Sequence, residues 1–393
     1  MIRKIVIVQV TPVYKSFIRK WCIDEIPRLG YKAQILDLSP VLRPELYNLS
    51  KNTFSDEDIN LTDVSYTVIE TYKSMDEFFR MNHTAFFFVT FSNFYYERHV
   101  FSLLKKYKIN YANLSGISSE LGIEDITDIA QLKDRISIEH IRHAIYNRLL
   151  RRFNNYQPQY LAISSKMNER YQIKINMYKN IDKILRIHSY DYENYLRTVA
   201  YNNDSRPYCV FLDSYVPFHP DFVIDQNRKI DPDGYYKEIS DIFDGIEKEL
   251  DLEIIIAAHP RANEEIERKY FGRYKIFYGM TSELVKGADL VLSHFSNSIA
   301  FGIMAYKPIV IINNASISKV DLFSRRCMNY AEKLSLKLIR NREDISTDIT
   351  EVDISRYHDF IGNVITYQER KAPCFWNLII SEAEKAGALI SIN

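Results

Sequence analysis

Short runs of apolar and β-branched residues recur along this chain, and each is followed by a longer amphipathic segment. Runs such as residues 5–10, 86–91 and 252–258 are typical of strands that are buried on both faces of a sheet. The segments between such runs, for example residues 17–29 and 234–250, predict helices. This alternation predicts an α/β fold in which helices cover parallel sheets.

The same patterns predict the remaining elements. Further strands are expected at residues 33–38, 110–114, 160–163, 183–188, 208–212, 275–278, 290–293 and 309–312. Further helices are expected at residues 64–79, 97–107, 282–287, 297–306 and 376–385, with a long charged helical segment at 120–155. Residues 39–60 contain Pro40, Pro44 and many polar residues, so we expect a loop there.

The chain length predicts two domains. At roughly 100–200 residues per domain, 393 residues are enough for two separate cores. The polar segment 202–207 has the composition of a linker. We therefore expect two Rossmann-like domains, residues 1–200 and 201–393, facing each other across a central cleft. The last helix is able to return to the N-terminal domain, and ligands should lie at the strand ends.

Composition argues against several classes of protein. The 51 Lys and Arg residues balance 51 Asp and Glu residues, so nucleic-acid binding through bulk positive charge is not expected. No stretch approaches the roughly 18–20 apolar residues of a membrane span, so any membrane association should be peripheral. Only 11 glycines occur, and no Gly-rich phosphate-binding loop is found.

No metal site is predicted. The four cysteines are far apart in the sequence, which indicates a reduced, cytoplasmic protein without a zinc-type cysteine pair. His140 and His143 share one face of a predicted helical segment, but no third ligand is evident.

Asp213 directly follows the predicted strand 208–212. At the carboxyl end of a buried strand, its carboxylate can face a ligand and act as a general base toward a hydroxyl group. The alternative is an Asx-turn, in which the carboxylate accepts a hydrogen bond from the loop backbone. The sequence leaves both roles open.

His259, Pro260 and Arg261 directly follow the predicted strand 252–258. An imidazole there can donate a proton or hydrogen bond to a phosphate leaving group, and a guanidinium can pair with its charge. Pro260 fixes the direction of the chain. The sequence therefore predicts a phosphate-binding motif, and a histidine paired only with local backbone is the alternative.

Ser293, Ser296, Asn297 and Ser298 lie between a predicted strand and a predicted helix. Hydroxyl groups, backbone N–H groups and the positive end of a helix dipole can bind phosphate without glycines. Capping of the helix by Ser296 or Asn297 is compatible with that role. Glu283, one loop earlier, can accept hydrogen bonds from a ribose or a base edge.

Four further residues are candidates for binding an acceptor. Thr11 and Tyr14 follow the first predicted strand, Tyr215 follows Asp213, and His188 ends the predicted strand 183–188. The chain has 29 tyrosines, which fit either a sugar-stacking surface or the codon usage of an AT-rich genome.

Residues 208–312 resemble a known domain. His259-Pro260 is followed by Ser282-Glu283, by the strand 290–293, by the Ser-rich turn and by Lys307-Pro308. This order resembles the C-terminal nucleotide-binding domain of bacterial GT-B glycosyltransferases. Among them it is most similar to the sialyltransferase- and polysialyltransferase-like enzymes of capsule and lipooligosaccharide synthesis. That group carries an acidic motif, a His-Pro motif and a Ser/Thr motif in this order. Its acidic motif has paired acids followed by Gly, whereas Asp213 is followed by Ser-Tyr.

The resemblance implies a metal-independent, inverting transfer of a CMP-activated sugar to a bacterial surface glycan. The nucleotide sugar is the donor, and no other cofactor is expected. Asp213 would be the general base, His259 would assist departure of the CMP phosphate, and Ser296 with Ser298 would hold that phosphate. An oligosaccharide or glycolipid acceptor is implied, in the cytoplasm or peripherally at the inner membrane face.

The same pattern also occurs in polyol-phosphate transferases of teichoic acid synthesis and in non-hydrolysing sugar-nucleotide epimerases. A CDP-polyol phosphotransferase and a UDP-sugar 2-epimerase are therefore alternatives. A non-catalytic module that binds a glycan or a nucleotide is another.

Overall fold

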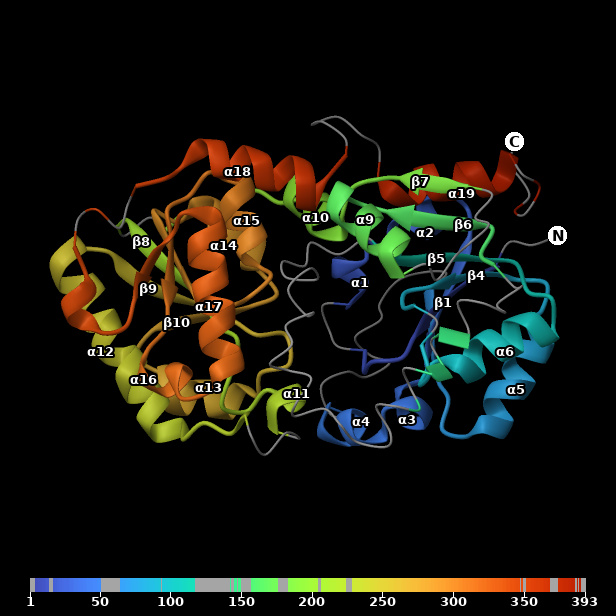
Figure 1. The fold of residues 1–393 in the computed structure, drawn as a ribbon, viewed down its shortest axis with the longest axis horizontal. Helices are drawn as coiled ribbons and strands as arrows, with labels where there is room; N and C mark the ends of the chain where they lie inside the picture. Colours follow the sequence, from blue (N-terminus) through green and yellow to red (C-terminus); the bar gives the residue numbers. More distant parts are fainter. Residues whose placement is uncertain are drawn as a thin grey trace. The chain divides into compact units, whose positions relative to one another are not determined.

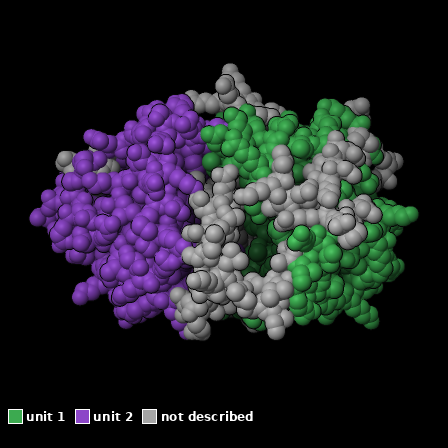
Figure 2. All heavy atoms as spheres, viewed as in Figure 1, with its two compact units in different colours: residues 1–193, 363–393 green, residues 194–362 purple. Residues whose placement is uncertain are grey.

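The chain divides into two compact units, which Figure 2 colours separately. Unit 1 comprises residues 1–193 and 363–393, and unit 2 comprises residues 194–362. The computed structural model describes residues 4–13, 17–50, 64–92, 94–116, 142, 145–146, 148–149, 157–175, 183–203, 206–223, 228–346, 348, 351–367, 374–385, 387 and 389. The sequence predicts a change of domain after residue 200, and the contacts divide the chain at residues 193 and 194.

The described part of unit 1 contains a seven-stranded parallel sheet (Figure 1) with the strand order β3-β2-β1-β4-β5-β6-β7. The strands are β1 (Lys4–Gln9), β2 (Lys32–Asp37), β3 (Val64–Val68), β4 (Phe86–Val89), β5 (Tyr111–Gly116), β6 (Tyr160–Ile163) and β7 (Ile184–Arg186). All except β3 are predicted from runs of apolar residues. Such runs are expected where both faces of a parallel sheet are covered.

Helices connect these strands. They are α1 (Phe17–Lys20), α2 (Glu25–Arg28), α3 (Ser39–Leu42), α4 (Pro44–Ser50), α5 (Tyr72–Met81), α6 (Arg98–Lys106) and α9 (Lys166–Ile175). Two more helices follow the last strand, α10 (Tyr190–Arg197), which continues into unit 2, and α19 (Phe375–Lys385). One face of the sheet packs against α1, α2 and α19, and the other packs against α5 and α6. The predicted helical segment 120–155 lies almost entirely outside the described residues.

Three sequence predictions in unit 1 are wrong. The predicted helix 64–79 begins with β3, because pairing with β2 selects the extended conformation for this β-branched stretch. The predicted loop 39–60 begins with α3 and α4, in which Pro40 and Pro44 occupy first-turn positions that tolerate proline. The predicted helix 17–29 is divided into α1 and α2, and Cys22 between them has φ of 50°.

The C-terminal helix α19 is part of the core of unit 1. Trp376 is fully buried, its indole N–H donates to the backbone oxygen of Trp21 (2.6 Å), and its ring contacts Phe88 edge-on. Ile379, Ile380 and Ala383 belong to the same cluster as β1. Residues from the two ends of the chain therefore form one core.

The described part of unit 2 contains a six-stranded parallel sheet with the order β10-β9-β8-β11-β12-β13. The strands are β8 (Tyr208–Leu212), β9 (Glu253–Ala258), β10 (Lys275–Tyr278), β11 (Leu290–Ser293), β12 (Ile309–Ile312) and β13 (Lys337–Ile339). All except β13 are predicted from the sequence. The order reverses between β8 and β11, which is where ligands bind in open α/β sheets.

The helices of unit 2 follow the strands. They are α11 (Pro220–Val223), α12 (Pro232–Leu250), α13 (Glu264–Phe271), α14 (Thr281–Gly287), α15 (Ile299–Met304), α16 (Ala315–Ser318), α17 (Asp321–Leu334) and α18 (Ile354–Phe360). Three of these are capped by side chains. Asp231 accepts from the backbone N–H of Gly234 (2.9 Å) at the start of α12, and Asn263 accepts from Glu265 and Ile266 at the start of α13. The third is α18, where Asp353 accepts from the backbone N–H groups of Ser355 and Arg356.

Many aromatic residues of unit 2 form its interior. The rings of Tyr236 and Tyr270 stack at 4.0 Å, and Phe271 packs edge-on against Tyr236. Phe211 on β8 contacts Phe243 on α12 and Phe271 on α13. A share of the tyrosine and phenylalanine content therefore serves core packing rather than a sugar-binding surface.

Candidate functional site

Three of the predicted motifs follow three neighbouring strands of unit 2. Leu212 pairs with Ala257 of β9 on one side and with Ser293 of β11 on the other. The loops that begin at Asp213, His259 and His294 therefore leave the same edge of the sheet. Neighbouring strands are only about 4.8 Å apart, so this topology brings the acidic, His-Pro and Ser-rich motifs together. They lie at the point where the strand order reverses.

Asp213 is buried at the end of β8, with 4% of its surface exposed. Its Oδ1 accepts a hydrogen bond from the backbone N–H of Tyr215 (3.0 Å), which is the Asx-turn expected as one alternative. Its Oδ2 has no hydrogen-bond partner within the described part of the chain. Burial raises the pKa of this carboxyl, although the backbone N–H groups of Tyr215, His259 and Ser214 partly oppose that rise. A raised pKa makes the ionised carboxylate a stronger base.

The His259 ring is oriented by its own loop. Its Nδ1 accepts from the backbone N–H of Arg261 (3.1 Å), so the proton of the neutral ring is on Nε2. Nε2 is therefore the atom from which His259 can donate. Pro260 is exposed, and Arg261 is half-buried.

A second histidine lies beside His259. The ring of His219 contacts it edge-on, with ring centroids 4.8 Å apart. His219 is not among the site residues predicted from the sequence, although His219-Pro220 repeats the His-Pro pair of His259-Pro260. Two adjacent imidazoles in the loops after β8 and β9 suit an anionic group better than one.

The Ser-rich turn is held by its own hydrogen bonds. Ser296 Oγ accepts from the backbone N–H of Ser298 (3.2 Å), and Asn297 Oδ1 accepts from the Tyr330 hydroxyl (3.0 Å). Ser293 is fully buried. The predicted helix 297–306 is the shorter α15, and Ser298 makes no side-chain cap to it. Ser296, Asn297 and Ser298 are partly or fully accessible to a ligand, whereas Ser293 is not.

His294 supports this turn from inside the unit. It is fully buried, with Nδ1 donating to the backbone oxygen of Ile312 (2.7 Å) and Nε2 accepting from the Tyr235 hydroxyl (2.8 Å). Burial lowers the pKa of His294 to about 4, so the ring is neutral at physiological pH. In the sequence His294 is one of several polar residues after the apolar run 290–292, and only the packing reveals its two partners.

Glu267 is a second carboxyl that sequence analysis did not select. It lies on α13, is 0% exposed, and both its carboxylate oxygens have no hydrogen-bond partner among the residues described. Burial raises the pKa of Glu267, and the nearby Asp213 carboxylate raises it further. In the sequence it is one of several acidic residues near the start of a helix, so no local pattern distinguishes it.

Glu283 and Tyr215 also lie in unit 2. Glu283 is half-buried in the first turn of α14, and its backbone oxygen accepts from Tyr201 (2.9 Å). Tyr215 has φ of 51° and is buried, with its ring against Phe218. It therefore contributes to the interior and has little ring surface for stacking on a sugar.

The remaining acceptor candidates belong to unit 1. Thr11 is half-buried after β1, and its hydroxyl accepts from the side-chain amide of Gln9 (2.9 Å). His188 is 0% exposed, its Nε2 is hydrogen-bonded to Glu193 (2.6 Å), and its ring contacts Tyr192. His188 thus presents no surface to an acceptor. Tyr14 lies outside the described residues, as do His140 and His143.

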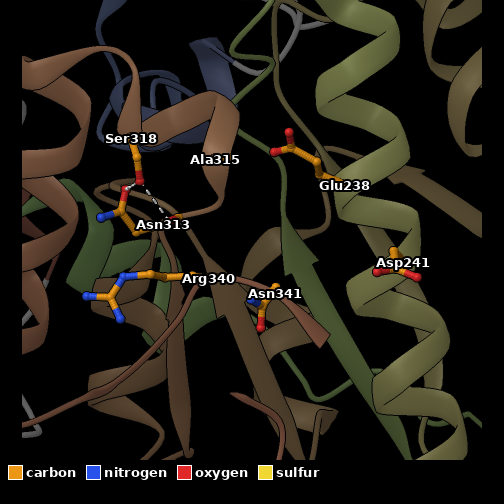
Figure 3. Close-up of a pocket in the computed structure, with 7 residues that line it drawn as sticks. All are labelled: Glu238, Asp241, Asn313, Ala315, Ser318, Arg340 and Asn341. Atoms are coloured by element: carbon orange, nitrogen blue, oxygen red, sulfur yellow. Dashed lines mark hydrogen bonds between the residues drawn. The ribbon is translucent and has the colours of Figure 1, made fainter. Parts of the chain in front are cut away.

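A separate pocket opens at the ends of β12 and β13 (Figure 3). It has a volume of about 250 Å³ and is lined by Glu238, Asp241, Asn313, Ala315, Ser318, Arg340 and Asn341. Glu238 accepts from the side-chain amide of Asn314 (2.6 Å) and from the backbone N–H of Ser316 (2.9 Å). The Arg340 side chain points away from the two carboxylates on α12. No residue of the three motifs lines this pocket.

None of the helices in the described residues is long and apolar enough to cross a membrane. No group of three or more His, Cys, Asp or Glu side chains in the same residues is arranged to hold a metal ion.

Comparison with solved structures identifies the architecture. The chain is similar to the wall teichoic acid polymerase TagF, with a TM-score of 0.57 and 14% identity over 98% of this chain and 90% of that one. It is also similar to S. aureus MnaA solved with UDP, with a TM-score of 0.51 and 11% identity over 99% and 98% of the two chains. A UDP-N-acetylglucosamine 2-epimerase has a TM-score of 0.51 and 10% identity over 100% of this chain and 98% of that one.

The chain has a GT-B-type fold. The sequence prediction of an α/β protein with two Rossmann-like parallel sheets is confirmed. The similar structures include a teichoic acid polymerase and a UDP-N-acetylglucosamine 2-epimerase. No protein-family model matches the sequence, and no curated protein matches it.

Proposed function

We propose that this protein is a transferase that uses a nucleotide-activated donor, with the nucleotide held by unit 2. The observation that carries this proposal is the convergence of Asp213, His259 and the turn at 296–298 at the edge of one sheet. A buried carboxyl of raised pKa, a histidine that donates through Nε2 and a polar turn are the groups that such a transfer requires.

The proposed reaction is an inverting transfer from a CMP-linked sugar. A hydroxyl oxygen of the acceptor attacks the anomeric carbon, and the bond from that carbon to the phosphate oxygen breaks. The phosphate leaves with the bonding electron pair, and Asp213 takes the hydroxyl proton. His259 Nε2 donates a hydrogen bond to the leaving phosphate, and Arg261 and Ser296 lie in the loops that can bind its charge. The acceptor would be an oligosaccharide or glycolipid at the inner membrane face.

The likeness to TagF favours a second candidate, the transfer of a polyol phosphate from a CDP-polyol. In that reaction a P–O bond of the donor breaks, and CMP is again the leaving group. The likeness to MnaA and to the 2-epimerase supports a third reaction, in which a UDP-sugar is converted with no acceptor present. The identity of the bound nucleotide distinguishes the first two reactions, which use a cytidine nucleotide, from the third reaction, which uses a uridine nucleotide.

The first experiment is a thermal-shift panel with CMP, CDP, UMP, UDP and GDP. We expect CMP and CDP to raise the melting temperature. Stabilisation by UDP alone would exclude both cytidine donors and leave the epimerase. CMP release from CMP-sugars and CDP-polyols, with and without candidate glycan acceptors, then distinguishes sugar transfer from polyol-phosphate transfer. A protein that binds CMP but turns over no donor would be a binding module.

The matched variants are His259→Ala and His358→Ala. Both residues are in unit 2, and His358 is exposed on α18 next to Tyr306. Loss of a hydrogen-bond or proton donor at the leaving group typically costs about 10²–10⁴-fold in rate. We expect that loss for His259→Ala and an unchanged rate for His358→Ala. Equal rates for both variants would remove His259 from the site.

A further inference from the structure

Several buried oxygen atoms beside Asp213 have no hydrogen-bond partner within the residues described. They are Asp213 Oδ2, Ser214 Oγ, Tyr236 Oη and both carboxylate oxygens of Glu267. The four side chains are exposed by 4%, 7%, 3% and 0%, respectively. Buried polar atoms are nearly always paired, because an unpaired one has lost its hydrogen bonds to water without replacement. These five buried oxygen atoms therefore require an explanation for their missing hydrogen bonds.

Three elements bring these atoms together. Asp213 and Ser214 follow β8, Tyr236 lies on α12, and Glu267 lies on α13. Tyr215 links the first of these elements to the third. Its backbone N–H donates to Asp213 Oδ1, and its hydroxyl is hydrogen-bonded to the backbone of Asn263, which caps α13. The backbone oxygen of Asn263 in turn accepts from the N–H of Glu267 (3.0 Å).

The two carboxyls, Asp213 and Glu267, influence each other and the hydroxyl of Tyr236. Burial is the main reason that the pKa values of Glu267 and of the Tyr236 hydroxyl are raised. The charge of Asp213 raises both further, and the charge of Glu267 adds to the rise for Tyr236. The Tyr236 ring is fixed by stacking on Tyr270 at 4.0 Å. Two carboxyls that share a low-dielectric site do not both ionise at neutral pH, because each charge opposes the other. At neutral pH, therefore, one of the two carboxyls is protonated and the other is ionised.

We propose that Glu267 is a positioning residue that shares a single proton with Asp213, with the Tyr236 hydroxyl beside the same pair. This role rests on the proposed function. Before transfer, Glu267 is the neutral acid and Asp213 is the carboxylate. The acceptor oxygen bonds to the anomeric carbon, the phosphate leaves with the electron pair of the broken bond, and the acceptor proton goes to Asp213. Both carboxyls are then neutral until one proton is released to solvent.

The test of proton sharing compares thermal unfolding from about pH 5 to 9 for the wild type, Glu267→Gln and the control Glu265→Gln. Glu265 is exposed on the same helix. The groups that act on this site are Asp213, Tyr215, Tyr235, Tyr236 and Tyr278, with Glu264 and Arg268 near Tyr278. These groups are common to all three proteins.

The direction in which stability should change with pH follows from proton binding. A carboxyl whose pKa is raised by folding binds its proton more tightly in the folded state, so its stabilisation is lost as the pH rises. The side-chain amide introduced by Glu267→Gln does not titrate. As the pH rises, the melting temperature of Glu267→Gln minus that of the wild type should therefore increase by roughly 3–5 °C per pH unit. The increase should end once the pH exceeds the raised pKa of Glu267. Glu265→Gln should run parallel to the wild type. Parallel curves for Glu267→Gln would overturn the proposal.

A second measurement needs no Glu267 variant. In protein labelled with ¹³C at the side-chain carboxyls, one Glu signal should titrate above pH 7, and Asp213→Asn should lower its midpoint by removing the opposing charge. If every Glu carboxyl titrates near its ordinary pKa, Glu267 does not hold the proton.

The reaction supplies the third readout. With CMP release as the assay, Glu267→Gln should leave the acid limb of the kcat–pH profile in place, because a neutral side chain lies near Asp213 in both proteins. It should remove the alkaline change in kcat that ionisation of Glu267 causes in the wild type, and leave KM for the donor unchanged. An alkaline change that persists in Glu267→Gln would contradict the positioning role. If the proton linkage is present but the wild type turns over no donor, the proposed function fails and the carboxyl pair stands as a structural feature only.

Discussion

The buried His294 makes the stability of unit 2 depend on pH in a way that can be calculated. Its pKa falls from an ordinary 6.5 to about 4 on folding, because burial disfavours the charged ring. Protonation therefore favours the unfolded chain. The contribution is fully present above pH 6.5 and is lost as the pH falls toward 4. Between pH 7 and 4.5, the loss from this group is about 2 kcal/mol.

The matched variant is His294→Gln, whose amide can accept from Tyr235 and donate to the backbone oxygen of Ile312 but does not titrate. Urea unfolding is followed at both pH values by far-ultraviolet circular dichroism, which reports on both units. The contributions of the other titrating groups to the free energy of unfolding are the same in both proteins, so they cancel in the comparison. The wild type should lose about 2 kcal/mol more than the variant between the two pH values. His358→Gln, at an exposed position, should behave as the wild type.

Tryptophan fluorescence supplies an internal control for this experiment. The only tryptophans, Trp21 and Trp376, are both in the core of unit 1. The transition that they report should not distinguish His294→Gln from the wild type if the two units unfold separately. Equal losses of stability for the wild type and His294→Gln in circular dichroism would refute the assignment of a neutral, buried His294.

Three further predictions concern single side chains. Asp213→Asn should lower donor turnover by about 10²–10⁴-fold while CMP still raises the melting temperature, and unchanged turnover would remove Asp213 as the base. Arg43→Met should cost unit 1 about 3 kcal/mol in urea unfolding at neutral pH, because it leaves the buried carboxyl of Glu97 unpaired. That cost should shrink at acidic pH, where Glu97 is protonated, and a pH-independent cost would contradict the explanation. Trp376→Ala should cost unit 1 about 3–5 kcal/mol, with Trp21 as the remaining fluorescent probe; a cost below about 1 kcal/mol would contradict its place in the core.

Strand positions follow from the sequence where both faces of a strand are covered. The predicted boundaries of β8, β11 and β12 agree with the structure, because each is a continuous apolar run in the interior of a parallel sheet. β3 is at the edge of its sheet and only half-buried, so its sequence carries a weaker signal. The sequence predicts a loop in place of α3 and α4 because of Pro40 and Pro44. Proline is common in loops, but it also occurs in the first turn of helices.

The candidate site was predictable to the extent that it depends on strand ends. Asp213 and His259 are each marked by the apolar run that precedes them. His294 also follows a predicted strand, but its burial and its partners, like the raised pKa of Glu267, depend on neighbours distant in sequence, such as Tyr235 for His294 and Asp213 for Glu267. The Asx-turn of Asp213 was one of two alternatives, and the structure shows that it uses only one carboxylate oxygen.

Unit 1 is built from two separate segments of the chain, residues 1–193 and 363–393, and this has a consequence for biosynthesis. A ribosome makes the chain from residue 1 onward, so every residue of unit 2 is available before α19 exists. Unit 2 can complete its fold during translation, whereas the core of unit 1 waits for Trp376 and its neighbours. A nascent or prematurely terminated chain would thus expose the apolar surface of β1 that α19 covers, and would be a natural substrate for chaperones and proteases.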